Sequence, residues 1–280
     1  MRRIMPIMLA LVLGAGVSYA SDLALYIGHP NPGWYLEDQM LKDAQKIVDA
    51  VKGLFKEVKM FNDDKLKELQ AWAEANLDDG ELDIIWLPGT MPSVLYPNPN
   101  KQPDGSLAEN WLDKGNMFIN VADWFAYCTY ETGARGADNG KAGAENILDL
   151  PGIIRFGDNT AMKRTPAGDK YLPSLPKEFR TDRPVVIGAI KSPWEVAALF
   201  GSPGGSDNPA KEADADPIVI HNTKTDGYVA IINQAALDDA LKRADLTIDF
   251  IKNWVAEVVK LTPVEPAGKL PVTWGAIKAR

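Results

Sequence analysis

Four short apolar runs alternate with helical patterns in the first half of the chain, and this alternation restricts the fold more than any other feature. Each run is bounded by Pro, Gly, Asn or polar residues and predicts a buried strand, at 23–28, 58–61, 82–87 and 117–122. Residues 35–55 carry apolar side chains at helical spacing. Strands that alternate with helices predict a mainly parallel sheet covered by helices on both faces.

The second half of the chain is predicted to complete this sheet after a long insertion. Residues 132–183 are rich in Gly, Ala and Pro, and they predict an irregular functional insertion with a helical turn near 144–150. Further strands are predicted at 184–189, 217–221 and 227–232, and further helices at 65–77 (capped by 62–64), 106–114, 193–200 and 240–260.

The N-terminus has the three parts of a secretory signal peptide. Arg2 and Arg3 form a basic region, residues 4–17 are apolar, and Ser18 to Ala20 provide small residues at a cleavage site. We expect residues 1–20 to be removed and the protein to be periplasmic or secreted; a retained anchor is the alternative. The remaining chain is divided into a domain at 21–262 and a tail at 263–280.

Composition excludes several classes of partner. The chain has 280 residues, a formal net charge of −8 and one cysteine. An acidic protein is repelled by the negative charge of nucleic acid or an anionic membrane, so neither is expected as a binding partner. No run after the signal peptide is long and apolar enough to span a bilayer. A single cysteine cannot form an internal disulfide, so the fold depends on its hydrophobic core.

The strand at 117–122 ends abruptly at Asp123, within the sequence GNMFINVAD. In α/β hydrolases a sharp turn after a strand presents the nucleophile. Here the turn carries Asp123, and Cys128 follows five residues later. The corner therefore has the pattern of a hydrolase site without a Ser or Cys in the expected position.

Several of these elements together resemble the class I glutamine-amidotransferase-like superfamily, and within it the ThuA-like (trehalose-utilisation type) group. The matching segments are LALYIG, LDIIWLPG, GNMFINVAD, GYVAIINQA and the helix DLTIDFIKNWV, at 23–28, 82–89, 115–123, 227–235 and 245–255. The resemblance implies an α/β fold, a flavodoxin-like three-layer sandwich with a mainly parallel central sheet and a large irregular insertion. It also implies a small-molecule ligand of carbohydrate type.

The chain departs from the family pattern at the residues that would perform chemistry. Amidotransferases carry G-x-C-x-G at the corner, where this chain has Val121, Ala122 and Asp123. ThuA-like proteins often have a His at the corner and another after the last strand, where this chain has Asp123 and Asn233-Gln234. Glutamine hydrolysis is therefore not expected.

Three residues are candidates for catalysis: Asp123, Cys128 and His221. Cys128 needs an adjacent base to form a thiolate, and His221 could serve as that base in a Cys-dependent hydrolase. A buried structural cysteine is the alternative. Asp123 could instead cap the following helix.

Loops after the strands supply the candidate ligand-binding residues, because such loops line the crevice of an open parallel sheet. These candidates are His29, Asn31, Trp34, Trp124, Glu131 and Arg135. Asp123 could accept hydrogen bonds from sugar hydroxyls while Trp124 gives a stacking face. Asp123 and Glu131 could also form an acid/base pair, although the sequence does not fix their separation.

No cofactor is expected. The chain lacks a G-x-G-x-x-G fingerprint and a phosphate-binding loop, and its two histidines have no partner at metal-ligand spacing. Three functions stay open: a carbohydrate-related ligand-binding or degenerate hydrolase-like protein, a non-catalytic protein-interaction module, and a hydrolase using Cys128 and His221. The sequence does not predict an oligomeric state.

Overall fold

The computed structural model describes residues 18–19, 21–157, 159–261 and 263–264. The predicted signal peptide lies outside these residues except for β1 (Ser18–Tyr19), and the tail lies outside them except for β14 (Pro263–Val264). These two short strands pair antiparallel, with Ser18 opposite Val264. Among the described residues no helix is long and apolar enough to cross a bilayer.

A seven-stranded sheet forms the centre of the molecule. Its order is β3-β2-β4-β5-β13-β12-β9, and the first five strands are parallel. The strands are β2 (Asp22–Tyr26), β3 (Glu57–Phe61), β4 (Ile84–Leu87), β5 (Met117–Val121), β9 (Trp194–Leu199), β12 (Ile218–Asn222) and β13 (Tyr228–Ile232). β2, β4 and β5 are buried along their whole length, which explains their continuous apolar sequences.

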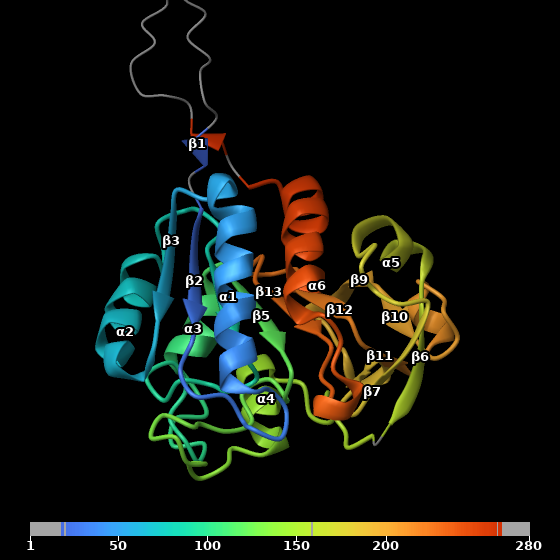
Figure 1. Ribbon diagram of the computed structural model, residues 1–280, viewed down its shortest axis with the longest axis horizontal. Helices are drawn as coiled ribbons and strands as arrows, with labels where there is room; N and C mark the ends of the chain where they lie inside the picture. Colours follow the sequence, from blue (N-terminus) through green and yellow to red (C-terminus); the bar gives the residue numbers. More distant parts are fainter. Residues whose placement is uncertain (1–17, 20, 158, 262, 265–280) are drawn as a thin grey trace, which may run out of the picture.

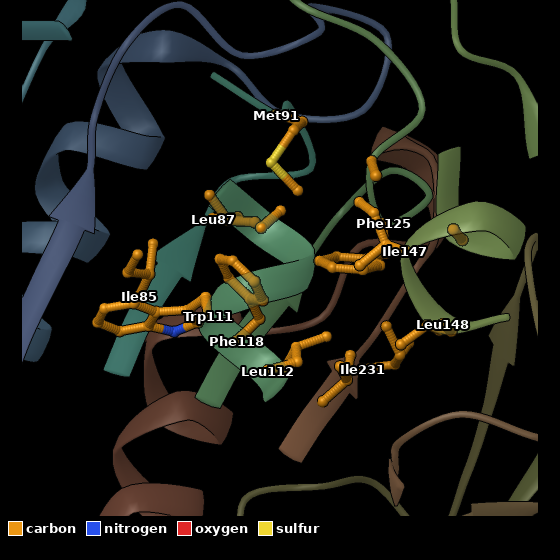
Figure 2. Packing of buried hydrophobic residues seen from close by; sticks show 14 of the residues in the cluster. Ile85, Leu87, Met91, Trp111, Leu112, Phe118, Phe125, Ile147, Leu148 and Ile231 are labelled. Atoms are coloured by element: carbon orange, nitrogen blue, oxygen red, sulfur yellow. The ribbon is translucent and has the colours of Figure 1, made fainter. Parts of the chain in front are cut away.

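Helices cover both faces of the sheet (Figure 1). On one face α1 (Glu37–Val51) packs beside α6 (Arg243–Asp249), which continues as the π-helix η6 (Phe250–Val259). The opposite face is covered by α2 (Leu66–Ala75), α3 (Leu107–Asp113) and α4 (Lys141–Leu148). Figure 2 shows this second layer, where Trp111, Leu112, Ile147 and Leu148 pack with Ile85, Phe118 and Ile231 of the strands. The predicted flavodoxin-like three-layer fold with a mainly parallel sheet is confirmed.

Short 3-10 turns join several of these elements: η1 (Lys52–Leu54), η2 (Asp63–Lys65), η3 (Ile187–Ala189), η4 (Pro209–Lys211) and η5 (Leu237–Asp239). The helix predicted from Ser106 is capped as expected, because the Ser106 hydroxyl accepts a hydrogen bond from the Glu109 amide.

Two predictions around residue 190 were wrong. Residues 193–200 do not form a helix but contain β9, which pairs with β12 at the edge of the sheet. In residues 184–189 the strand is limited to β8 (Val185–Val186), and the turn η3 follows it; β8 pairs with β11 (Asp214–Ala215) in a separate two-stranded sheet. In β9, Trp194 and Leu199 are buried while Glu195 is exposed, so the strand is only half-buried. A short segment of this kind cannot be told from a helix by its apolar residues alone.

The insertion is more regular than its composition suggested. It contains α4 as well as β6 (Thr160–Arg164), α5 (Pro166–Tyr171) and β7 (Glu178–Thr181). β6 and β7 form a three-stranded antiparallel sheet with β10 (Gly201–Ser202). The signal for α5 was present in the sequence, since Thr165 caps the helix and Pro166 occupies its first turn.

Candidate functional site

The corner predicted after β5 is present and is built from two neighbouring strand ends. Ala122 follows β5 with φ 69° and Asn233 follows β13 with φ 54°. The Ala122 amide donates to the Asn233 carbonyl at 3.2 Å. This left-handed conformation costs roughly 1–2 kcal/mol for a residue with a Cβ, so the surrounding packing must fix the turn. Gly89 is part of that packing, because a Cβ there would lie 2.4 Å from the Asp123 amide nitrogen.

Asp123 is completely buried at this corner and both of its carboxylate oxygens are occupied. Oδ2 accepts a hydrogen bond from Asn31 Nδ2 at 2.8 Å, and Oδ1 accepts one from the Trp124 amide at 2.7 Å. Arg183 Nη1 lies 3.1 Å from Oδ1. Burial raises the pKa of Asp123, and the charge of Arg183 acts in the opposite direction. The carboxylate is therefore held inside the protein, with no open face for a ligand.

Arg183 fills the space in front of the corner. Its guanidinium carbon lies 3.9 Å from the ring centre of Trp124 and 4.0 Å from that of Trp34. Tyr127 and Phe156 surround it at 5.2 and 5.3 Å. Trp34 and Trp124 thus stack on a protein cation, where the sequence predicted contacts with a ligand. No local pattern marks Arg183, which comes from the loop after β7.

A buried network fixes the Arg183 loop to the end of β13. Asp216 is fully buried and accepts hydrogen bonds from the amides of Asn233 and Gln234, both at 2.7 Å, and from the Thr181 hydroxyl. The Gln234 side-chain amide in turn donates to the Arg183 carbonyl at 2.6 Å. Burial raises the pKa of Asp216 to about 6. Asn233 and Gln234 stand at the position where the family resemblance implies a histidine. Here they fix the backbone after β13 and the backbone at Arg183.

The structure does not bring Cys128 and His221 together. The Cys128 carbonyl accepts a hydrogen bond from Met91, beyond the carboxyl end of β4. His221 lies opposite Tyr228, which begins β13, so it sits at the amino edge of the parallel strands. Its ring stacks on Tyr228 and lies 3.1 Å from Asp226 Oδ1. The geometry needed for a Cys–His hydrolase is absent from these residues.

Cys128 is expected to be chemically inert in the folded protein. The side chain is completely buried, and burial raises the pKa of its thiol to about 12. Modification by a disulfide reagent at pH 8 should be about 100-fold slower in the native protein than in urea, because only an exposed thiolate reacts. Equal rates in the two states would contradict the buried position.

His29 belongs to a second cluster at the carboxyl ends of β2 and β3. Its Nδ1 lies 2.5 Å from Asp63 Oδ2, and the Tyr26 hydroxyl donates to Asp63 Oδ1 at 2.5 Å. Gly28 permits this approach, because a Cβ there would lie 2.0 Å from Asp63 Oδ1. The hydrogen bond with Asp63 raises the pKa of His29. Asp63 was predicted as a helix cap, although its position directly after a strand could have indicated the site.

A pocket of about 380 Å³ opens beside this pair. His29 is 42% exposed at its side chain, and Asp63, Asp64, Glu37 and Glu131 also line the pocket. Glu131 is held at the rim by Ser93, whose hydroxyl donates to Oε2 at 2.8 Å. The pocket is therefore accessible and polar, in contrast to the closed corner at Asp123.

The other predicted site residues have structural partners. Asn31 holds Asp123 and accepts a hydrogen bond from the Tyr130 hydroxyl at 3.2 Å. Arg135 makes a two-pronged ion pair with Asp138, and both distances are 2.7 Å. In the part of the chain that the structure describes, no group of three His, Cys, Asp or Glu side chains is placed to hold a metal ion.

No protein-family model and no curated protein matches the chain. Among solved structures it is similar to a ThuA-like protein from Bacteroides uniformis, with 13% identity, a TM-score of 0.44 and coverage of 84% of this chain and 91% of that one. It is also similar to a cytoplasmic protein from Salmonella typhimurium, with 8% identity, a TM-score of 0.43 and coverage of 82% and 97%. A third is the glutaminase domain of Trypanosoma brucei CTPS with bound acivicin, with 11% identity, a TM-score of 0.39 and coverage of 88% and 97%.

Proposed function

We propose that this protein is an exported, non-hydrolytic binding protein for a small polyhydroxylated ligand of carbohydrate type, which it binds in the pocket beside His29 and Asp63. The observation that carries the proposal is the contrast between two sites at the same edge of the sheet. The corner that hydrolases use is closed by Arg183, whereas His29 and Asp63 face an open pocket. Export is proposed from the basic and apolar pattern of the first 20 residues.

The chemistry of the pocket suits a ligand rich in hydroxyl groups. Carboxylates accept hydrogen bonds from hydroxyls, and His29 can donate to a ligand from Nε2 when it is protonated, because its Nδ1 is engaged by Asp63. A volume of about 380 Å³ falls within the usual range for small-molecule sites. Asp63, Asp64, Glu37 and Glu131 line the pocket without any Lys or Arg among its lining residues. A neutral or amino sugar therefore suits the pocket better than a sugar acid.

A thermal-shift comparison of D-glucose, D-glucosamine and D-glucuronate tests this proposal. A ligand that binds only the folded state raises the melting temperature, and the stabilisation grows with the logarithm of 1 + [L]/Kd. We expect stabilisation by glucosamine or glucose at millimolar concentration and none by glucuronate. A preference for glucuronate would contradict the charge argument, and no response to any of the three would count against a carbohydrate ligand.

A further inference from the structure

The guanidinium of Arg183 occupies an enclosure that has the composition of a binding site for an organic cation. We call this enclosure the cage: the rings of Trp34, Trp124, Tyr127 and Phe156, with the buried carboxylate of Asp123. Aromatic faces and a carboxylate together are the groups that recognise quaternary ammonium and guanidinium ligands. The side chain of Arg183 is only 12% exposed within it.

Charge and ring faces hold the guanidinium, and directional bonds contribute little. Arg183 Nη1 is buried without a hydrogen-bond partner among the described residues, although it lies 3.1 Å from Asp123 Oδ1. The contact is therefore ionic and does not have hydrogen-bond geometry. The indole nitrogen of Trp124 is likewise buried and unpartnered. A cage without specific bonds to its occupant accepts any cation of similar size.

The backbone around the cage is held by hydrogen bonds that do not involve the Arg183 side chain. The Arg183 amide donates to the Gln234 carbonyl at 3.1 Å. The Trp34 carbonyl accepts a hydrogen bond from Arg243 Nη1 at 2.8 Å, and the Tyr127 amide donates to the Trp124 carbonyl at 3.2 Å. Phe156 forms the outer wall and is 59% exposed. Trp34 and Tyr127 are half-buried, so three of the four rings lie partly at the surface.

We propose that the cage is a binding site for a small organic cation with a guanidinium or quaternary ammonium group, and that Arg183 is an internal occupant that competes with this ligand. The site is distinct from the pocket at His29. The closed corner is then a regulated site. A cationic ligand binds when the Arg183 side chain moves out of the cage, and Arg183 closes the cage when no ligand is bound.

The Arg183→Ala variant tests the proposal with two nearly isosteric probes, methylguanidinium and neutral methylurea. Calorimetry and tryptophan fluorescence measure binding, and near-UV circular dichroism checks the fold. We expect saturable binding of methylguanidinium, at least tenfold tighter than in the wild type, with no binding of methylurea. Adding Asp123→Asn to this variant should weaken binding about tenfold. Equal binding of the two probes, or no saturable binding by the folded variant, overturns the proposal.

If the variant does not fold, the wild type decides the question. Phenylglyoxal modifies exposed arginines, and peptide mass spectrometry measures the modified fraction of Arg183. A saturating concentration of tetramethylammonium should increase the modification rate of Arg183 several-fold while the rate at Arg180, an exposed arginine outside the cage, stays constant. An unchanged rate at Arg183 overturns the proposal.

Discussion

Replacing Asp123 with Ala is expected to lower the free energy of unfolding by about 3–5 kcal/mol, because it leaves the largely buried guanidinium of Arg183 without its counter-charge. Asn31 Nδ2 and the Trp124 amide lose their acceptor in the same substitution. Urea denaturation followed by far-UV circular dichroism measures the change. A loss below about 1 kcal/mol would show that the corner does not depend on the ion pair.

The double variant separates the ion pair from the other contacts of Asp123. Arg183→Met keeps much of the side-chain volume between Trp34 and Trp124 but removes the charge. We expect Asp123→Ala combined with Arg183→Met to be less destabilised than the sum of the two single variants, by about 1–3 kcal/mol, since the uncompensated charge is gone. Additive effects would mean that the two side chains are not energetically coupled.

The second large effect concerns Asp83, a carboxyl group that is completely buried at the amino end of β4. Its Oδ1 accepts a hydrogen bond from the Asp22 amide at 2.5 Å. Burial raises the pKa of Asp83 to about 7, and the carboxylates of Asp79 and Asp22 act in the same direction while Lys56 opposes them. Asp83 is therefore mainly protonated in the folded protein below about pH 7.

The sign of the pH dependence follows from this raised pKa. The folded state binds the proton more tightly than the unfolded state, so Asp83 stabilises the fold below about pH 4 and this stabilisation is lost as the pH rises through 7. Asp83→Asn keeps the acceptor for the Asp22 amide but cannot ionise. We expect the variant to gain about 2–4 kcal/mol relative to the wild type between pH 4 and pH 8.

Urea denaturation at pH 4, 6 and 8 checks this expectation. The exposed Asp113→Asn substitution removes the same charge from the surface and serves as the control, with an expected change below about 0.5 kcal/mol at each pH. If Asp83→Asn and the wild type had parallel pH profiles, Asp83 would be ionised in the folded protein throughout this range.

The sequence predicted the central architecture well. Continuous apolar runs that alternate with helical periodicity are typical of one arrangement, a mainly parallel sheet covered by helices. β2, β4 and β5 and the helices α1 and α3 lie where their patterns placed them. The prediction failed where local pattern was weak. β9 carries only a short apolar segment. In the sheet of β6, β7 and β10, the paired strands are separated in the sequence by loops and other elements. Such long-range pairing leaves little trace in a local window.

The site was predictable in position but not in its partners. The sharp corner after β5 and the location of His29 follow from the rule that strand ends line the crevice. The partners of these residues come from distant segments: Arg183 lies 60 residues beyond Asp123, and Asp63 lies 34 residues beyond His29. Cys128 and His221 are attractive as a pair by residue type alone, and only the strand register places them at opposite edges.

One titration tests the central claim that ligand binding belongs to the pocket at His29 and is independent of the inert thiol beyond the corner. Calorimetry with D-glucosamine would compare the wild type with His29→Ala and Cys128→Ala. We expect the wild type and Cys128→Ala to bind with the same Kd, and His29→Ala to bind at least tenfold more weakly. Loss of binding in Cys128→Ala with unchanged binding in His29→Ala would contradict the account.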